Sequence, residues 1–173
     1  MTVVGTADRA ASPEARFNAL FARHYPAVFG YAARRVGRDE AGDAAAEVFT
    51  VAWRHLSRVP PEPEALPWLY GVARKVVANH ERAARRRLRL EAKAAGGAVA
   101  PAAGPDAAGF DVEAAVLRLG EADREVLRLA AWEELQPAEI AAVVGCSANA
   151  AAVRLHRARQ RLAEEMQGGG WTP

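Results

Sequence analysis

The sequence predicts an all-α protein built from two small helical domains joined by a flexible linker. The chain has 173 residues, of which 51% are apolar, and many of these are alanine, a strong helix former. Apolar side chains recur at helical spacing through two long regions. Between them, residues 92–110 are rich in Ala, Gly and Pro and lack a periodic apolar stripe, which is typical of a linker.

These observations divide the chain into five segments. We expect a disordered tail over residues 1–13, a first domain over 14–91, the linker over 92–110, a second domain over 111–166 and a tail over 167–173. Alternatively, part of the linker continues the last helix of the first domain. Each domain is small enough to bury only a modest core, so docking on a partner would stabilise it.

The first domain is expected to begin with two amphipathic helices. Ser12 can cap a helix that starts at Pro13 and ends at Gly37, with Pro26 bending or splitting it. The second helix begins at Asp39, where acidic residues in the first turn complement the helix dipole. Its expected buried stripe consists of Ala45, Val48, Phe49, Ala52, Trp53 and Leu56.

A proline-rich loop, residues 57–67, precedes a third helix that is expected to run from Pro67 to about Arg89. This helix becomes strongly basic toward its end and can follow a phosphate backbone. Trp68, at its start, either packs in the core or stacks on an unpaired base. The side chains expected to contact nucleic acid are Trp68, Arg74, Lys75, Asn79, Arg82, Arg85 and Arg86.

The helices expected in the second domain cover residues 111–119, 121–132, 137–144 and 148–166. The last two have the layout of a helix-turn-helix. Gly145 lies where the chain must turn sharply, and glycine adopts the left-handed conformation at little cost. Ser147 can cap the helix that follows.

The last helix of this domain has two distinct faces. Alanine and leucine side chains at 151, 155, 158 and 162 have the spacing of a core-facing stripe. Arginines lie on another side, where they can pair with guanine edges or phosphates in a major groove. The residues expected to contact DNA are Asn149, Arg154, Arg157 and Arg161.

Charge is distributed unevenly along the chain. Residues 1–95 carry 16 Arg and Lys against 10 Asp and Glu, whereas residues 96–173 carry 7 against 11. Local basic patches lie at 74–93 and 154–161, which suggests two contacts with a polyanion. The alternative is that both patches are solvated helix faces.

Catalysis and metal binding find little support. The four histidines are scattered, and no Cys/His set has metal-ligand spacing. No glycine-rich phosphate loop is present. The acidic side chains of residues 39–47 lack the second cluster that a metal site would need. We therefore expect no enzyme, no metal and no cofactor.

Cysteine usage and hydropathy bear on the compartment. Cys146 is the only cysteine, so no intramolecular disulfide can form, which fits a reducing cytoplasm. The N-terminus lacks the apolar core of a signal peptide, and no apolar run approaches the thickness of a bilayer. These features predict a soluble, cytoplasmic protein without membrane insertion.

Three stretches of the sequence are similar to the motifs of one known protein family. Residues 43–53, DAAAEVFTVAW, are similar to a D-L-V-Q-E-x-F-L-R-A-W segment. Residues 68–82, WLYGVARKVVANHER, are similar to W-L-x-x-I-A-R-N-x-x-x-D-x-x-R. Residues 123–162 resemble a second domain with R-E-V-L-x-L, E-I-A-x-x-L-G and R-L-x-R-A-R-x-x-L patterns. In this order the motifs resemble those of the extracytoplasmic-function (ECF) sigma factors of bacterial RNA polymerase, over roughly residues 14–90 and 112–166.

The resemblance implies an alternative sigma factor that binds core RNA polymerase and promoter DNA and itself catalyses no reaction. The first domain would bind the clamp helices of the largest polymerase subunit through Asp43, Glu47 and Phe49. The third helix and its preceding loop would hold open the minus-ten element. The helix over residues 148–161 would read the minus-thirty-five element. An inhibitory anti-sigma protein is a further expected partner.

The chain departs from the family pattern at Ala46, Val51, Lys75, Asn79, Ala152 and Val153. The first two replace Gln and Arg on the polymerase-binding helix, and the next two replace Asn and Asp on the minus-ten helix. The last two replace a common Arg–Ser pair, which leaves Arg154 and Arg157 as the expected base contacts.

Two other functions remain open from the sequence. One is a helix-turn-helix transcriptional regulator that acts without being a polymerase subunit. The other is a helical enzyme that holds a metal on the acidic face of residues 39–47. The segments around Trp53 and Trp68 argue against the first of these, and elemental analysis for a bound divalent ion would test the second.

Overall fold

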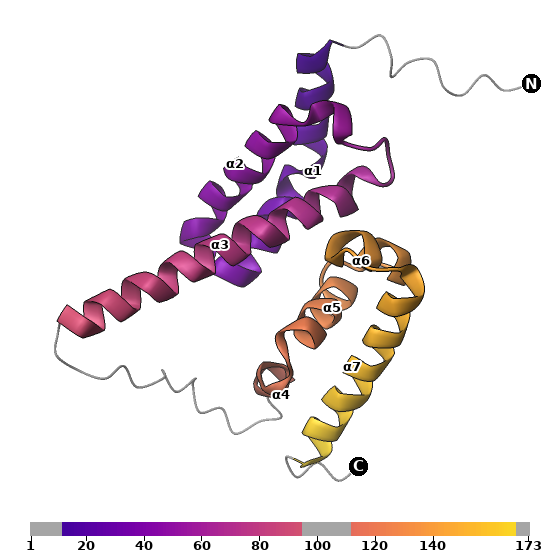
Figure 1. The fold of residues 1–173 in the computed structure, drawn as a ribbon. Helices are drawn as coiled ribbons and strands as arrows, with labels where there is room; N and C mark the ends of the chain where they lie inside the picture. Colours follow the sequence, from indigo (N-terminus) through magenta and orange to yellow (C-terminus); the bar gives the residue numbers. More distant parts are fainter. Residues whose placement is uncertain (1–11, 95–111, 169–173) are drawn as a thin grey trace, which may run out of the picture. The chain divides into compact units, whose positions relative to one another are not determined.

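The computed structural model describes residues 12–94 and 112–168, and the regular elements in these ranges are all helices. The chain divides into two compact units, residues 1–86 and 87–173. This confirms the all-helical, two-part fold that the sequence predicts (Figure 1).

The first unit contains α1 (Pro13–Val36), α2 (Arg38–Arg54), a short 3-10 turn (Leu56–Arg58) and most of α3 (Ala65–Ala94). The amide of Ala15 donates to Ser12 Oγ at 3.2 Å, so Ser12 is the N-cap of α1, as predicted. Pro26 lies inside α1, which continues as one helix to Val36. Gly37, at φ 85°, ends it.

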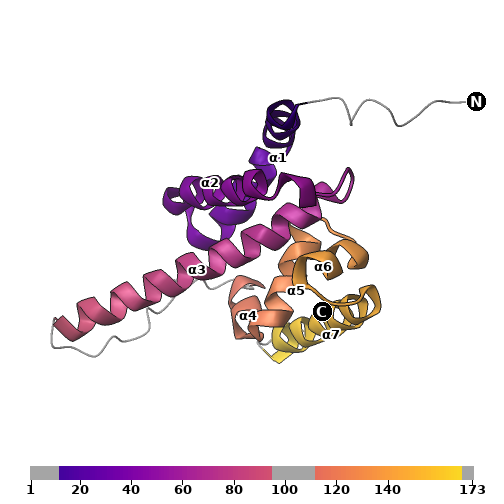
Figure 2. The same cartoon turned by 45° about the horizontal axis from the view of Figure 1, so that its top comes forward.

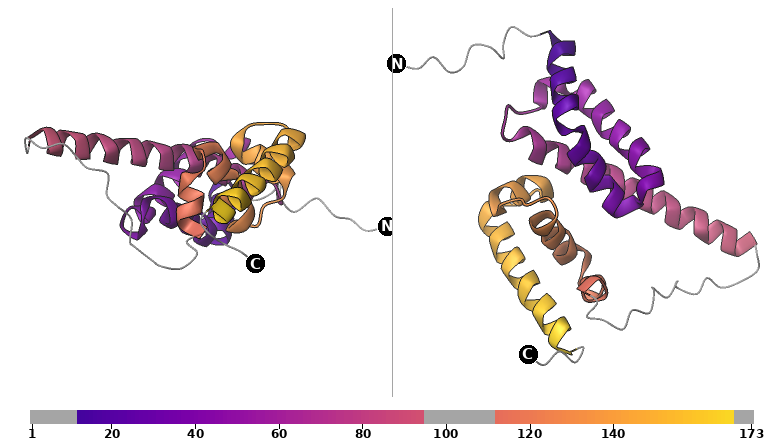
Figure 3. Two further views of the ribbon diagram at one scale, coloured as in Figure 1. Left: turned by 90° about the horizontal axis from the view of Figure 1, so that it is seen from below. Right: turned by 180° about the vertical axis from the view of Figure 1, so that it is seen from behind.

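Small residues allow α1 and α2 to pack closely. The two helices run side by side in opposite directions (Figure 3). Four alanines of α2 have no exposed surface, because they recur on the side that faces α1 and α3. Tyr31 of α1 and Tyr70 of α3 bring their ring centroids to 5.3 Å, which joins the third helix to this core. The four alanines are Ala41, Ala44, Ala45 and Ala52.

Both ends of α3 differ from the prediction. The helix begins at Ala65 rather than at Pro67. Pro67 lies in the first turn, where its missing N–H would have no helical partner in any case. The helix ends at Ala94, three residues inside the predicted linker, because residues 88–94 are mostly strong helix formers. The rest of that linker lies outside the described residues.

The second unit contains α4 (Val112–Arg118), α5 (Glu121–Ala131), α6 (Pro137–Val144) and α7 (Ala148–Gly168). Helix α7 packs against the other three (Figure 2). It extends two residues into the predicted C-terminal tail, whose remaining residues lie outside the described range. The core side chains with the least exposure are Val126, Leu129, Ile140, Ala151 and Ala158.

Within residues 12–94 and 112–168, no single helix is both long enough and apolar enough to cross a bilayer. Only α6 and α7 taken together reach the required length and hydropathy, and the chain bends by 102° between them.

Candidate nucleic-acid interfaces

Helices α6 and α7 form the helix-turn-helix that the sequence predicts. Three residues, 145–147, separate the helices, and the chain direction turns by 102° between them. Gly145 adopts the left-handed conformation, at φ 77° and ψ 45°, and its amide donates to Ala141 O at 2.9 Å. Ser147 Oγ then accepts the amide of Ala150 at 3.2 Å, which caps α7. Local hydrogen bonds therefore hold the angle at which α7 is presented.

One face of α7 is anchored in the core of its unit. Ala151 and Ala158 have no exposed surface, and Leu155 is 4% exposed. The guanidinium of Arg161 forms an ion pair with Asp123 of α5. Farther along, Arg118 Nε of α4 donates to Glu165 Oε2 at 2.7 Å. These contacts fix the rotation of α7 about its own axis, and so decide which side chains face outward.

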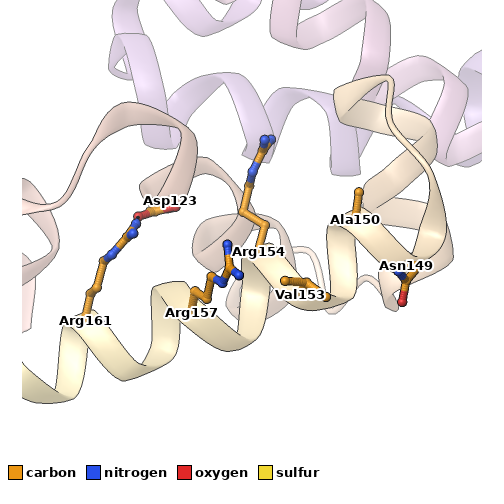
Figure 4. Close-up of a pocket in the computed structure, with 7 residues that line it drawn as sticks. All are labelled: Asp123, Asn149, Ala150, Val153, Arg154, Arg157 and Arg161. Carbon is orange, nitrogen blue, oxygen red and sulfur yellow. Dashed lines mark hydrogen bonds and ion pairs between the residues drawn. The ribbon is translucent and has the colours of Figure 1, made fainter.

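The outward face of α7 borders a hollow of about 400 Å³ (Figure 4). Arg154 and Arg157 are exposed on this face, and neither forms a hydrogen bond or ion pair with another described residue. Their charges are therefore available to an external anion. The hollow is lined by Asp123, Asn149, Ala150, Val153, Arg154, Arg157 and Arg161.

The four side chains predicted to contact DNA from α7 do not act as one group. Asn149 is exposed but points away from the arginines in Figure 4. Arg161 turns toward Asp123, so its charge is compensated within the protein. Sequence periodicity could not reveal this pair, because the two residues are 38 positions apart on different helices.

Two arginines on the basic face of α3 already have polar partners in the same helix. Arg82 donates to Asn79 Oδ1 at 2.5 Å and to Ala78 O at 3.1 Å. Arg85 lies 4.0 Å from Glu81, one turn earlier in the same helix. The remaining predicted cations are exposed and make no polar contact with the described part of the protein. They are Arg74, Lys75 and Arg86.

The loop before α3 is tied to α1. Arg16 donates to Val59 O at 2.7 Å, and the buried ring of His24 lies 2.6 Å from Glu62 Oε1. Trp68, at the start of α3, is half-buried. This partial burial is compatible with both roles considered for it, packing in the core and stacking on an unpaired base.

The predicted polymerase-binding residues of α2 are found in different environments. Asp43 and Glu47 are exposed. Phe49 is 2% exposed, so almost all of its ring is packed within the protein. Trp53, expected in the buried stripe, is 44% exposed and packs its ring 5.2 Å from that of Phe17. The accessible aromatic side chain of α2 is thus Trp53.

An aromatic groove that sequence reasoning missed lies between α1 and α2. It encloses about 590 Å³, and Phe21 on its rim is 39% exposed. The sequence shows that the phenylalanines of α1 recur at helical spacing, but only the packing shows which rings stay accessible. The groove is lined by Glu14, Phe17, Asn18, Phe21, Ala46, Phe49, Thr50 and Trp53.

His80 connects α3 to α2 through two carboxylates. Its Nε2 lies 2.9 Å from Glu47 Oε1, and its Nδ1 lies 3.4 Å from Glu40 Oε2. Burial lowers the pKa of His80, but hydrogen bonds and charge attraction from Glu47 and Glu40 outweigh it and leave the pKa raised. His80 was not predicted as a site residue, since its partners lie 33 and 40 positions away.

The acidic face of α2 does not gather metal ligands. Across residues 12–94 and 112–168, no group of three or more His, Cys, Asp or Glu side chains is arranged to hold a metal ion. Glu40 and Glu47 instead face the imidazole of His80.

Both parts of the sequence match known protein families. Residues 20–87 match the family model of Sigma-70 region 2, and residues 110–162 match that of Sigma-70, region 4. The ECF RNA polymerase sigma factor SigD of Mycobacterium tuberculosis is 34% identical over 161 residues, covering 84% of this chain and 74% of that protein. SigD of Mycobacterium bovis is equally similar.

Solved structures show the same fold. CnrH, in complex with the cytosolic domain of CnrY, is 26% identical, with a TM-score of 0.61 over 92% of each chain. The sigma factor RpoE of Bartonella quintana, in complex with the anti-sigma factor NepR, is 23% identical, with a TM-score of 0.59 over 87% of this chain and 96% of that one. The helix-turn-helix, the two family matches and the SigD identity together place this chain among the ECF sigma factors, the non-enzymatic proteins that direct RNA polymerase to promoters.

Proposed function

We propose that the two units of this sigma factor divide promoter recognition between them, and that α7 reads the minus-thirty-five element. The observation that carries this assignment is the 102° turn into α7 together with the uncompensated arginines on its outward face. A helix presented at this angle can enter a major groove. Arg154 and Arg157 would pair with guanine edges or with phosphates, whereas Arg161 would position α7 through Asp123.

Helix α3 and the loop before it hold the minus-ten element in this proposal. Arg74, Lys75 and Arg86 supply charge for the phosphate backbone. Trp68 offers a partly exposed ring at the junction with the loop, where an unpaired base can stack. The tie between Glu62 and His24 would keep the loop in place while the strands separate.

The polymerase-binding surface is assigned to α2 and its flank. Asp43 and Glu47 provide exposed carboxylates, and Trp53 provides an exposed aromatic side chain beside them. Polar groups around an accessible aromatic anchor are common at protein interfaces. Trp53 therefore replaces the buried Phe49 in this assignment.

An anti-sigma protein is a further proposed partner, and the cytoplasm is the proposed compartment. CnrH and RpoE were each solved in complex with a partner, which for RpoE is the anti-sigma factor NepR. By analogy, an inhibitor would hold this chain until a signal releases it. Cytoplasmic action would follow from the need to meet RNA polymerase and DNA.

Run-off transcription tests the division of labour. Core RNA polymerase with the full chain, on fragments of the parent genome, should produce start sites that core polymerase alone does not, and their alignment should reveal both promoter elements. R154A and R157A should each reduce transcription from these promoters. The matched control is R159A, because Arg159 is exposed on the same helix but lies two residues, about 200° of rotation, from Arg157.

Two outcomes would contradict this proposal, and the second would favour a helix-turn-helix regulator that acts without RNA polymerase. If R159A reduces transcription as much as R157A does, the outward face of α7 does not read DNA selectively. If the protein yields no specific transcripts and does not co-elute with core polymerase, the assignments of both units fail.

A further inference from the structure

An apolar side chain occupies the middle of the outward face of α7. Val153 is 41% exposed. It lies two residues from Ala151 and two from Leu155, both buried, and two residues correspond to about 200° of rotation around a helix. Val153 therefore points away from the core. Along the helix it stands between Asn149 and Arg157, at the edge of the hollow (Figure 4).

This valine has an unfavourable effect on the free protein. Valine is β-branched and therefore forms helices less readily than alanine, the residue at many other helical positions of this chain. Val153 also leaves apolar surface in water. A single exposed valine on an ordinary surface, such as Val112, needs no explanation. Val153 differs because polar side chains suited to DNA surround it on the face that would enter the groove.

The major groove offers an apolar group that a valine can cover. Guanine presents acceptors, cytosine presents a donor and adenine presents both, whereas thymine presents an acceptor and a C5-methyl group. We propose that Val153 contacts the C5-methyl group of a thymine in the minus-thirty-five element, beside the base or phosphate paired by Arg157. This inference rests on the proposed function, in which α7 reads that element.

Neighbouring side chains support a compact apolar contact. Ala150, one turn before Val153, is also exposed and lines the same hollow, and its short side chain leaves room for a base edge. Arg154 and Arg157 extend from the helix beside it (Figure 4). An element with a thymine next to a guanine would match this order of apolar and cationic groups.

Removal of one methyl group tests the contact. After the element is mapped, each of its thymines, on either strand, is replaced singly by deoxyuridine, which lacks only the C5-methyl group. Binding of promoter DNA to the holoenzyme, formed from core polymerase and the full chain, is then measured. At one position, deoxyuridine should weaken binding about fourfold, the loss expected for one buried methyl group.

The variant V153A, combined with the deoxyuridine promoters, forms a double-mutant cycle that tests whether Val153 is the partner of the methyl group. It should weaken binding to the thymine promoter and bring the effect of deoxyuridine at that position near unity, because the partner of the methyl group is gone. V112A is the matched control, since Val112 is a valine 48% exposed on α4. It should keep the wild-type affinity and the wild-type response to deoxyuridine.

Three results would overturn the contact. In the first, no thymine of the element is sensitive to loss of its methyl group. In the second, V153A responds to deoxyuridine as the wild type does. In the third, the element contains no A·T pair. Failure of the proposed function is distinguishable, because the wild-type holoenzyme would then show no dependence on the minus-thirty-five element at all.

Discussion

Helices α3 and α7 both carry arginine-rich faces, but they hold them differently. Helix α7 is packed along its length, and an ion pair to α5 fixes its rotation. Helix α3 is packed only over its first part, and every side chain from Arg85 to Glu91 is exposed. Arg82 and Arg85 contact side chains of the same helix, one turn away.

This difference separates two ways of binding DNA. Base readout requires side chains held in a fixed register, and α7 has the supporting contacts for it. Phosphate contacts tolerate variation in position, because charge attraction depends weakly on direction. The exposed cations of α3 are suited to this second task. We therefore expect substitutions in α7 to alter sequence preference, and substitutions in α3 to alter the affinity for all promoters alike.

The largest expected effect is the loss of stability caused by removing a buried leucine from the core of either unit. Leu129 and Leu69 are both fully buried, one in each unit. We expect L129A and L69A each to destabilise its own unit by about 2 to 5 kcal/mol. Hydrogen exchange followed by mass spectrometry should show lost protection only in residues 112–168 for L129A. For L69A, the loss should be confined to residues 13–86.

Either leucine serves as the control for the other. Loss of protection in both units after one substitution would mean that the units unfold together. Helices α3 and α7 would then belong to a single cooperative fold.

The next effect is the loss of promoter binding when an arginine is removed from α7 or from α3. R157A should cost about 1 to 3 kcal/mol on the mapped promoter and relax preference at one base position. R74A should weaken holoenzyme binding to all promoters alike and reduce the slope of log affinity against log salt by about one. Binding titrations at several salt concentrations on wild-type and mutated promoters measure both. A uniform loss for R157A would place α7 in the same class as α3.

Replacing one glycine by alanine in each unit should change the free energy of unfolding in opposite directions. Gly145 adopts φ 77°, with no atom within 4 Å of an added Cβ, so the cost of G145A comes from backbone conformation alone. We expect a loss of about 1 to 2 kcal/mol in the second unit. Gly42 lies inside α2 with equal space around it, and G42A should stabilise the first unit by about 0.5 to 1 kcal/mol. Urea unfolding measures both; a neutral G145A would show that the turn can be made in another way.

Local chemistry made much of the fold predictable. Ser12, Gly37, Gly145 and Ser147 act on neighbouring backbone groups, so their roles can be inferred from sequence alone, and the structure confirms them. The ends of α3 were placed less well, because helix propensity near a proline or a linker changes gradually along the chain.

Contacts between helices were not predictable in the same way. Periodicity identifies the apolar side of a helix but not its rotation against a neighbour. Periodicity placed both Phe49 and Trp53 in the buried stripe, whereas the family resemblance placed Phe49 on the polymerase surface. In the structure Phe49 is buried and Trp53 is exposed. The pairs of Arg161 with Asp123 and of His80 with Glu47 depend on that rotation, and they become visible only in the folded structure.

The smallest expected effect tests the tie between α3 and α2. The pKa of His80 is raised in the folded protein, so folding favours its protonated form. The resulting stabilisation is complete below the pKa of an unfolded histidine, about 6.5, and is lost as the pH rises through the higher folded-state pKa. The free energy of unfolding of the wild type, relative to H80Q, should therefore fall between pH 6 and pH 8.5, by about 0.2 to 1 kcal/mol.

An NMR titration of the His80 ring measures the same linkage directly and should give a pKa above 6.5. H55Q is the matched control for the unfolding experiment, because His55 is an exposed histidine of the same unit that lies outside this cluster. Its difference from the wild type should not reproduce the pH dependence seen with H80Q. A pKa below 6.5 would reverse the sign: burial would then outweigh Glu47 and Glu40, and the free energy of unfolding of the wild type relative to H80Q would rise with pH instead.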